Sequence, residues 1–462
     1  MSEQTNAYQT PSTQGEARAS VQVWLTSADQ QALFDRQASS FGFTDNTGDM
    51  PVIAISTEES YQPIEGFGFS LTGGSAMLIA ALPDAERLAL LRELFLPEGD
   101  GIGVSCLRLS IGASDLSERC FSYDDVPDGQ TDLELAQFDL NAGDIELIPL
   151  LKDILALNPT LKIIATAWSA PRWMKTNQAF IGGKLKPECY AVYAAYLVKY
   201  LQAIRDRGIV IHAITPQNEP LNQKNEPSMV MEAPEQAAFI KNHLGPALRD
   251  AGLTDVELFC WDHNCDVPEY PLAVFADADA RQYLSGSAWH LYGGDISVLS
   301  KMHQAYPDMK LYFTEQWVGS DGEFGGDLMW HVRHVLIGSL RNWSRAVLEW
   351  NLASDPFCGP HTPGGEARCV GALTIAGDQV TRNVAYYVIA HATKFVRPGS
   401  VRIHSSDPNV LSNVAFLTPA GSIVLIVLND TAEPQAFAIQ YQNKNAVATL
   451  PARAVATYVW EA

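Results

Sequence analysis

Eight short runs rich in β-branched and aromatic residues recur through the middle of this chain, and longer amphipathic stretches separate them. The runs span residues 64–73, 104–114, 161–170, 211–220, 256–264, 287–294, 310–319 and 345–354. In the stretches between them, such as 84–95, 145–157 and 189–208, apolar residues recur at steps of three and four, which is typical of helices. Alternating strands and helices indicate a parallel sheet, and eight strands close such a sheet into a (β/α)8 barrel.

An open, doubly wound sheet is the alternative fold for the same alternation of strands and helices. That architecture binds its ligand at a phosphate-binding glycine turn or in a crevice where the strand order reverses. The glycines nearest to the first run, Gly66 and Gly68, form no GxGxxG motif. The sequence therefore favours the closed barrel, an α/β fold.

The pattern changes near residue 396, where short strand-like runs follow one another without helices, as in an antiparallel sheet or sandwich. Two further strand-like runs, 20–27 and 52–56, precede the barrel, and we expect them to pair with the C-terminal strands. The expected organisation is a disordered segment in 1–19, N-terminal strands of a β-sandwich side domain in 20–58, the (β/α)8 barrel in 59–395 and the C-terminal part of the sandwich in 396–462.

The charge balance argues against several classes of partner. With 31 basic and 53 acidic residues, the chain carries a formal charge of −22, which repels nucleic acid and anionic lipid. The sequence has no apolar run long enough to predict a membrane span. The first twenty residues are polar and lack the apolar core of a signal peptide, which indicates a cytoplasmic protein or a chain that begins after a removed leader. The sequence does not indicate an oligomeric state.

Seven cysteines are too few and too scattered to predict a disulfide framework. Cys358 and Cys369 flank a loop rich in glycine and proline and can pair, although free or buried thiols are the favoured interpretation. No CxxC or HExxH spacing indicates a metal site.

The polar residues that close the strand-like runs form the candidate site, because the active site of a (β/α)8 barrel lies at the C-terminal ends of its strands. They include two carboxylates, an arginine and several aromatic rings, and no Ser–His or Cys–His pair. Such a set indicates glycoside hydrolysis by paired carboxylates. The candidates are Arg108, Trp168, Asn218, Glu219, His290, Tyr292, Glu315 and Trp350.

Glu219 and Glu315 end the fourth and seventh runs, ITPQNEP and LYFTEQW. Strands three apart in a ring of eight lie almost across the barrel mouth from each other, so the two carboxylates can converge. A retaining mechanism needs them about 5–5.5 Å apart, one as nucleophile and one as acid. The acid must stay protonated near neutral pH, so we expect its pKa to be raised by burial or by a neighbouring charge.

Each candidate also has a structural interpretation. A single glutamate at a strand end is usually a loop charge, but two on opposing strands favour catalysis. Trp168 and Trp350 can be barrel packing, although flat sugar faces stack well on indole rings. Arg108 can belong to a structural ion pair, and His290 is either a satisfied core histidine or a site residue. A non-catalytic carbohydrate-binding barrel is expected to lack one carboxylate, and both are present.

Six motifs make the chain similar to glycoside hydrolase family 30, a group of retaining (β/α)8 enzymes that includes glucosylceramidases and β-1,6-glucanases. They are IEGFGFSLTGGSA, LRLSIGASDLS, ATAWSAPRWMKTN, ITPQNEP, FTEQWVG and LEWNLASDPFCGPHTPGG. The resemblance runs from about Ile64 to the C-terminus. It implies a β-sandwich side domain made from both chain ends and a reaction that needs no cofactor.

The resemblance also implies a role for most of the candidates. It makes Glu219 the acid/base and Glu315 the nucleophile. It assigns Asn218 to the sugar 2-hydroxyl, Trp168 and Trp350 to the sugar-binding walls, and Arg108 and Tyr292 to positioning the nucleophile.

Three departures from the glucosylceramidase pattern bear on the substrate. Gly73 stands where those enzymes have an aspartate that contacts the far hydroxyls of glucose, and WHLY (289–292) replaces their HWY. The loop ending at Cys369 resembles the β-1,6-glucanase branch, which often has two cysteines here, and Glu366 occupies what is read as the first of those positions. The expected substrate is therefore a β-1,6-linked glucan or gentio-oligosaccharide, with glucosylceramide, β-xylosides and β-fucosides as alternatives.

Overall fold

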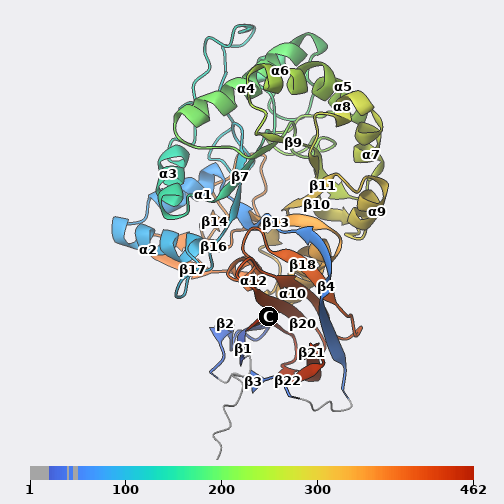
Figure 1. Ribbon diagram of the computed structural model, residues 1–462. Helices are drawn as coiled ribbons and strands as arrows, with labels where there is room; N and C mark the ends of the chain where they lie inside the picture. The colour runs from blue at the N-terminus through green and yellow to red at the C-terminus, as the bar shows by residue number, and fades with distance from the viewer. Residues whose placement is uncertain (1–19, 39–40, 45–49) are drawn as a thin grey trace, which may run out of the picture.

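A computed structural model of the chain describes residues 20–38, 41–44 and 50–462. It contains a closed eight-stranded barrel and, beside it, a ten-stranded sheet to which both ends of the chain contribute (Figure 1). The segment 1–19, for which we expected disorder, lies outside the described residues. No helix in the described ranges has the length and apolar character needed to cross a membrane.

The barrel has the order β10-β11-β13-β5-β6-β7-β8-β9, and all its neighbouring strands are parallel. In chain order its strands are β5 (Gly66–Ser70), β6 (Cys106–Ser110), β7 (Lys162–Thr166), β8 (Ala213–Thr215), β9 (Glu257–Cys265), β10 (Gly286–Gly294), β11 (Lys310–Glu315) and β13 (Ser344–Asn351). Each lies within one of the eight predicted runs or differs from it by one residue at an end. The predicted α/β barrel is confirmed.

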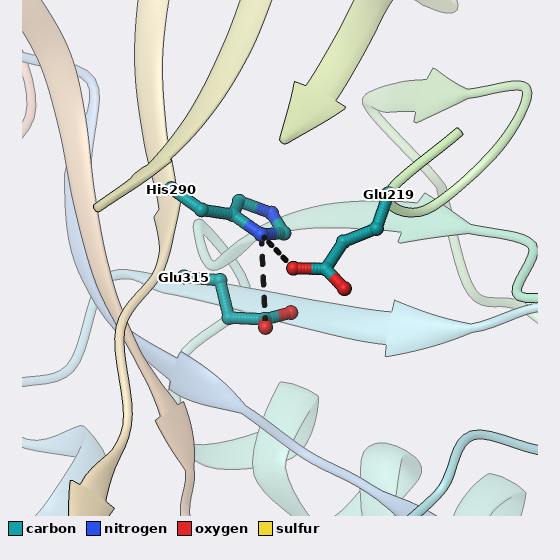
Figure 2. Close-up of side chains that lie close together, drawn as sticks. All are labelled: Glu219, His290 and Glu315. Carbon is teal, nitrogen blue, oxygen red and sulfur yellow. Dashed lines mark hydrogen bonds and ion pairs between the residues drawn. The ribbon is translucent and has the colours of Figure 1, made fainter. Parts of the chain in front are cut away.

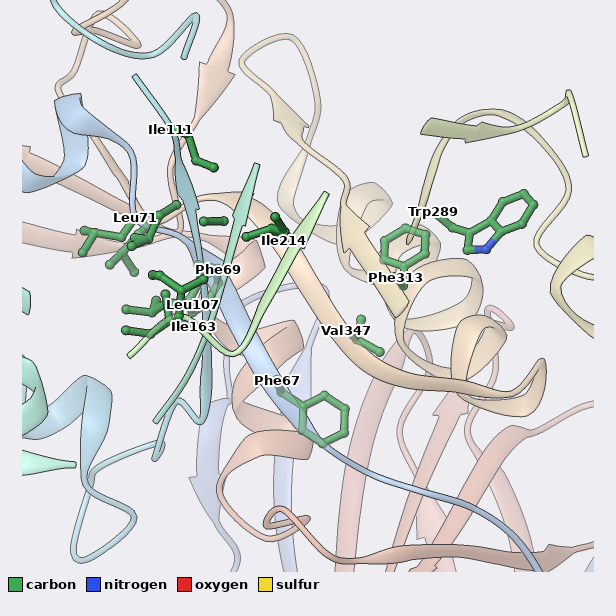
Figure 3. Close-up of a cluster of buried hydrophobic side chains, with 14 of the residues drawn as sticks. Phe67, Phe69, Leu71, Leu107, Ile111, Ile163, Ile214, Trp289, Phe313 and Val347 are labelled. Carbon is green, nitrogen blue, oxygen red and sulfur yellow. The ribbon is translucent and has the colours of Figure 1, made fainter. Parts of the chain in front are cut away.

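Side chains alternate between the inside and the outside of the barrel, as the two-residue period of a strand requires. One side chain from most strands, among them Cys106, Ala213 and Tyr312, fills a separate inner cluster. Their neighbours, such as Leu107 and Phe313, face outward and pack in the large core under the helices (Figure 3). A residue two positions beyond an inner one therefore also points into the barrel, closer to its mouth.

The helices surround the barrel (Figure 1). α2 (Asp84–Phe95) has Asp84 and Glu86 in its first turn and Arg92 in its last, which complements the helix dipole. Its bounds match the predicted stretch, and α3 (Leu147–Leu157) and α4 (Tyr190–Asp206) lie within theirs. The other α-helices are α1 (Gly73–Ala80), α5 (Ala233–Phe239), α6 (Gly245–Asp250), α7 (Glu269–Ala276), α8 (Ala278–Arg281), α9 (Val298–Ala305), α10 (Phe324–Trp330), α11 (Ser339–Arg341) and α12 (Val384–Thr393). Two π-helical segments, 240–244 and 331–338, join α5 to α6 and α10 to α11.

The side domain combines strands from both chain ends, as predicted. Its order is β2-β1-β23-β20-β19-β18-β4-β21-β22, with β3 paired to β1. The strands are β1 (Ser20–Ser27), β2 (Leu33–Arg36), β3 (Phe41–Gly42), β4 (Val52–Pro63), β18 (Val401–Ser405), β19 (Ser412–Leu417), β20 (Ser422–Asn429), β21 (Gln435–Tyr441), β22 (Lys444–Leu450) and β23 (Ala454–Glu461). The expected boundary between residues 58 and 59 falls inside β4, which continues to Pro63.

Short strands outside the barrel brace the loops at its mouth. β12 (Val318–Gly319) pairs with β15 (Cys369–Val370), and β14 (Ala353–Ser354) pairs with β16 (Leu373–Ala376), which pairs with β17 (Gln379–Arg382). These pairings tie the loop that follows β11 to the loop that follows β13.

His391 on α12 joins the barrel to the sandwich. Its ring is fully buried, with Nδ1 2.8 Å from Thr457 Oγ1 and Nε2 2.9 Å from Thr26 Oγ1. The two threonines come from β23 and β1, so one side chain connects a barrel helix to both ends of the chain. Burial lowers the pKa of His391 to about 3, and the ring is therefore neutral in the folded protein at neutral pH.

This histidine should make the free energy of unfolding depend on pH. Between about pH 6.5 and pH 3 the unfolded chain protonates His391 and the folded protein does not, so stability falls as the pH falls through this window. The slope from one such group reaches about 1.4 kcal/mol per pH unit. Urea unfolding of the wild type and of His391→Gln across this range should show a shallower pH dependence in the variant. Parallel curves would contradict this role.

Candidate active site

The structure brings Glu219 and Glu315 together at the mouth of the barrel. Glu315 is the last residue of β11, and Glu219 follows β8 by four residues. Both are buried, and both line a pocket of about 450 Å³, called here the central pocket. A carboxylate oxygen of Glu219 and one of Glu315 lie within 4.8 Å of each other. The two opposing strands thus present their acids to the same space.

His290 on β10 lies between these two glutamates (Figure 2). Its Nδ1 is 3.2 Å from Glu219 Oε1 and 3.7 Å from Glu315 Oε1. Its Nε2 is 3.0 Å from Asp262 Oδ1. The side chain is fully buried and contacts three carboxylates.

Asp262 is a central residue of this cluster that the sequence analysis did not select. It lies in β9 at a bulge, where the register with β10 skips from Trp261 to His263. Trp261 and Asp262 have φ values of 73° and 69°, in the left-handed region that bulky residues rarely adopt. A bulge redirects side chains, and here it points Asp262 to the barrel interior. The only signal in the sequence is the polar end of the run, WDHN.

Arg108 connects this buried aspartate to the candidate nucleophile. It lies two residues beyond the inner Cys106 on β6 and therefore points into the barrel. It donates to Glu315 Oε2 at 2.6 Å, to Asp262 Oδ2 at 3.0 Å and to Asn218 Oδ1 at 2.6 Å. The guanidinium group is fully buried, so it fixes all three acceptors in place.

Other hydrogen bonds complete the cluster. Tyr292 donates its hydroxyl to Glu315 Oε1 at 2.9 Å, which occupies the second oxygen of that carboxylate. Thr215 and Thr314, on β8 and β11, each donate to Asp262 at 2.7 Å. Asn222 donates to Glu219 Oε2 at 2.7 Å.

The proton in this cluster resides on the histidine. Burial disfavours charge on His290, but Glu315, Asp262 and Glu219 outweigh it and raise the pKa of the ring to about 9. Burial also disfavours the anion of Glu219, yet the bond and charge of His290, the charge of His263 and the bond from Asn222 lower the pKa of Glu219 to about 2. The expected rise in the pKa of the acid is therefore wrong, because a protonated histidine lies beside it.

Glu315 responds differently to the same surroundings. Burial raises the pKa of Glu315, and the positive charges of His290 and Arg108 oppose the rise without cancelling it. The arginine thus favours the ionised form, but burial has the larger effect. Three carboxylates share two cations, and their titrations are coupled.

The two candidate tryptophans form a stack beside Arg108. Trp168 and Trp350 have ring centroids 5.2 Å apart, and the guanidinium carbon of Arg108 is 4.9 Å and 5.5 Å from their respective centroids. Trp350 lines the central pocket, whereas Trp168 is 2% exposed and does not. Trp317, from the loop after β11, lines the pocket as well. Trp350 and Trp317 therefore present the indole surfaces of this site.

The rim of the central pocket is mostly polar. Residues 221–225, which follow Glu219, line one side, and Glu366 lines another. Glu366 accepts a hydrogen bond from Arg368 Nε at 3.0 Å, and Arg368 lies over the Trp317 ring at 5.3 Å. Cys358 and Cys369 are free thiols, so the pairing considered above is absent from this loop as the structure describes it.

Glu219, His290 and Glu315 also have the composition of a metal site. Among the described residues they are the one group of three or more His, Cys, Asp or Glu side chains whose ligand atoms all lie within 4.8 Å of one another. A metal would have to displace the proton of His290, whose pKa is raised to about 9. The hydrogen bonds within the cluster account for its geometry as it stands.

Comparison with known proteins identifies the class to which this fold and site belong. The glycosyl hydrolase family 30 TIM-barrel domain matches residues 64–396, and the family 30 beta sandwich domain matches residues 399–458. An endo-1,6-β-D-glucanase of Neurospora crassa is 37% identical over 387 residues, which cover 80% of this chain and 79% of that protein. The lysosomal acid glucosylceramidase of Mus musculus is 29% identical over 440 residues, covering 90% and 84% of the two chains.

The solved structure of an endo-β1,6-glucanase is 34% identical in sequence and superimposes with a TM-score of 0.89. The match covers 96% of this chain and 100% of that one. The protein belongs to glycosyl hydrolase family 30. It is a glycosidase, and its substrate is a carbohydrate.

The buried arginine should matter greatly for stability. Arg108→Met leaves the carboxylates of Asp262 and Glu315 without their cation in a buried site, and such a loss costs about 3–5 kcal/mol. Urea unfolding should show a large fall in the midpoint. Arg368→Met is the matched control, because its ion pair with Glu366 is exposed, and it should leave the midpoint close to that of the wild type. Equal effects of the two substitutions would contradict the role given to Arg108.

Proposed function

We propose that this protein hydrolyses β-1,6-linked glucan with retention of anomeric configuration. The observation that carries the proposal is the approach of Glu219 and Glu315, whose nearest oxygens lie within 4.8 Å. Retaining glycosidases have carboxyl groups about 5–5.5 Å apart, whereas inverting enzymes keep about 6.5–9.5 Å between them to admit a water. This spacing supports a covalent glycosyl–enzyme intermediate.

In this proposal Glu315 is the nucleophile. Arg108 and Tyr292 each bind one of its oxygens, at 2.6 Å and 2.9 Å, and so fix the direction from which it attacks the anomeric carbon. As the bond from Glu315 to carbon forms, the bond to the leaving oxygen breaks. Arg108 also holds Asn218 through Oδ1, which leaves the amide nitrogen of Asn218 to donate to the sugar 2-hydroxyl.

Glu219 is the acid and base, acting together with His290. The pair holds one proton at neutral pH, and the distance from His290 Nδ1 to Glu219 Oε1 is 3.2 Å. Transfer of this proton to Glu219 as the leaving oxygen gains charge makes Glu219 the general acid. In the second step Glu219 accepts a proton from the water that attacks the anomeric carbon of the glycosyl–enzyme. The bond from that carbon to Glu315 breaks, and the carboxylate of Glu315 is released.

The substrate assignment depends on the relatives, on Gly73 and on the polar rim of the central pocket. The Neurospora protein and the solved structure are both named as endo-β-1,6-glucanases. A side chain at Gly73, where glucosylceramidases have an aspartate, would require the Asp144 carboxyl group to move, because a Cβ there would lie 2.1 Å from Asp144 Cγ. The polar rim formed by residues 222–225 suits a hydroxyl-rich leaving group better than two lipid chains.

A substrate panel with product chromatography tests this assignment. The protein should cleave a β-1,6-glucan and release oligosaccharides of several lengths, as an enzyme that cuts within the chain does. Hydrolysis of glucosylceramide, aryl β-xylosides or aryl β-fucosides should be much slower. Cleavage of glucosylceramide at a rate above that of the glucan would overturn the substrate, although the enzyme class would stand.

Removal of the Glu219 carboxyl group distinguishes the acid/base from the nucleophile. Glu219→Ala should hydrolyse substrates with poor leaving groups at least about 100-fold more slowly than the wild type, because general acid catalysis contributes factors of that order. An activated aryl β-glucoside should lose little in its first step, and azide should restore turnover and yield a β-glycosyl azide. The matched variant Glu315→Ala should not give a β-azide. An α-azide from Glu219→Ala would contradict the assignment.

A further inference from the structure

A second pocket lies where the barrel meets the sandwich, and it is called here the junction pocket. Its volume is about 390 Å³, and the described residues that line it are all different from those of the central pocket. Gly99 and Asp100 form one wall, in the segment that joins α2 to β6. Residues of β1, β2, β17 and α12 form the others. A segment that precedes a barrel strand lies at the end opposite to the active site, so this pocket is remote from Glu219 and Glu315.

Aromatic rings cover much of the junction pocket. Two of them are partly buried and come from β1 and β2, and two are more deeply buried and come from α12. They are Trp24, Phe34, Tyr386 and Tyr387. Protein interiors are close-packed, and ligand sites of about 300–1,000 Å³ occur preferentially where domains meet. Aromatic rings around a space of this size therefore indicate a ligand site.

The backbone at Phe34 is strained, which is a second observation that points to a ligand. Its φ is 64°, in the left-handed region that bulky residues rarely adopt. Phe34 N donates to Thr26 Oγ1 at 3.0 Å, and the same hydroxyl contacts His391 Nε2 at 2.9 Å. These contacts hold Phe34 at the wall of the junction pocket. Strain of this kind is concentrated at functional sites.

A fixed polar pair lines the junction pocket beside the rings. Arg382 donates Nε to Glu93 Oε1 at 2.9 Å and Nη2 to Glu93 Oε2. Tyr386 donates its hydroxyl to Glu93 Oε1 at 2.8 Å. Two parallel bonds hold the guanidinium and the carboxylate in one plane. The pair therefore presents donors and acceptors side by side, as adjacent sugar hydroxyls require.

The wall formed by the segment 97–101 is fixed as well. Lys394, the residue after α12, donates Nζ to three carbonyl oxygens at 2.6, 2.8 and 2.9 Å. The three acceptors belong to Gly101, Gly99 and Pro97. The pocket thus keeps its shape without a ligand, as most small-molecule sites do.

The charges that line the junction pocket cancel. Three acidic and three basic side chains line it, so it favours a neutral ligand over a phosphate or an anionic lipid. They are Asp35, Glu93, Asp100, Arg36, Arg382 and Lys394. A neutral molecule with flat apolar faces for aromatic rings and neighbouring hydroxyls for a planar polar pair is a carbohydrate.

We propose that the junction pocket is a second, non-catalytic carbohydrate site, which holds a segment of the β-1,6-glucan that the active site cleaves. The choice of glucan rests on the proposed function. Because the two sites lie at opposite ends of the barrel strands, the junction pocket does not contact the ring being cleaved. It holds the polymer at the enzyme, which raises the effective concentration of its other segments at the central pocket.

Binding is tested by affinity electrophoresis in gels that contain a soluble β-1,6-glucan. Glu315→Gln, which should bind glucan without cleaving it, is compared with Glu315→Gln/Trp24→Ala and with the control Glu315→Gln/Trp330→Ala. Trp330 is 38% exposed on α10 and lines neither pocket. Removal of Trp24 should weaken the apparent affinity about 3- to 10-fold, the size of one aromatic stacking contact, and removal of Trp330 should leave it unchanged.

The same single substitutions in the active enzyme give a second readout. Trp24→Ala should lower kcat/KM for the soluble glucan by about 3- to 10-fold. Turnover of 4-nitrophenyl β-glucoside should be unchanged, because this small substrate occupies only the central pocket. Trp330→Ala should alter neither rate.

Two results would overturn the inference. One is equal retardation of Glu315→Gln with and without Trp24. The other is an equal loss of rate on the glucan and on the aryl glucoside, which would make the junction pocket a structural contact between the domains. If Trp24→Ala does not fold, as judged by thermal melting, Asp100→Arg replaces it, because it obstructs the pocket from its exposed rim. If the wild type does not cleave the glucan, the proposed substrate fails, and retardation alone then decides the inference.

Discussion

The mouth of this barrel is organised around a buried cluster in which Arg108 and His290 balance the carboxylates of Glu219, Asp262 and Glu315. Charges buried at this depth are tolerated only when they are paired and hydrogen-bonded. Here every carboxylate contacts at least one of the two cations, and each cation contacts at least two carboxylates. The position of either glutamate therefore cannot change without disturbing the whole cluster, and the protein obtains a rigid arrangement of reactive groups.

Barrel geometry explains how the cluster is assembled from distant parts of the chain. Arg108, Thr215 and Thr314 point inward because each lies two residues beyond a side chain of the inner cluster. Asp262 reaches the same space through a bulge in β9 with two consecutive left-handed residues. Glu219 also has a positive φ of 43°, and strain of this kind concentrates at functional sites.

Much of this arrangement can be predicted from the sequence, and the parts that cannot be predicted have identifiable physical reasons. The alternation of strands and helices is a local pattern, so it predicted the barrel and placed Glu219 and Glu315 on opposing strands. The bulge at Asp262 contains no glycine, and the polar end of the run, WDHN, does not reveal it without the pairing to β10. The pKa of Glu219 was wrongly expected to be raised, because the neighbour that lowers it, His290, is identified only by tertiary contact.

In the proposed mechanism, two carboxylates act on one sugar ring at the distance required for a covalent intermediate. The stereochemistry of the first product tests it most directly, since carboxylate separation determines the outcome. Proton NMR of the anomeric signals during the first minutes of β-glucan hydrolysis should show the β-anomer forming first, followed by slow mutarotation. Initial appearance of the α-anomer would mean direct attack by water and would contradict the mechanism proposed for Glu219 and Glu315.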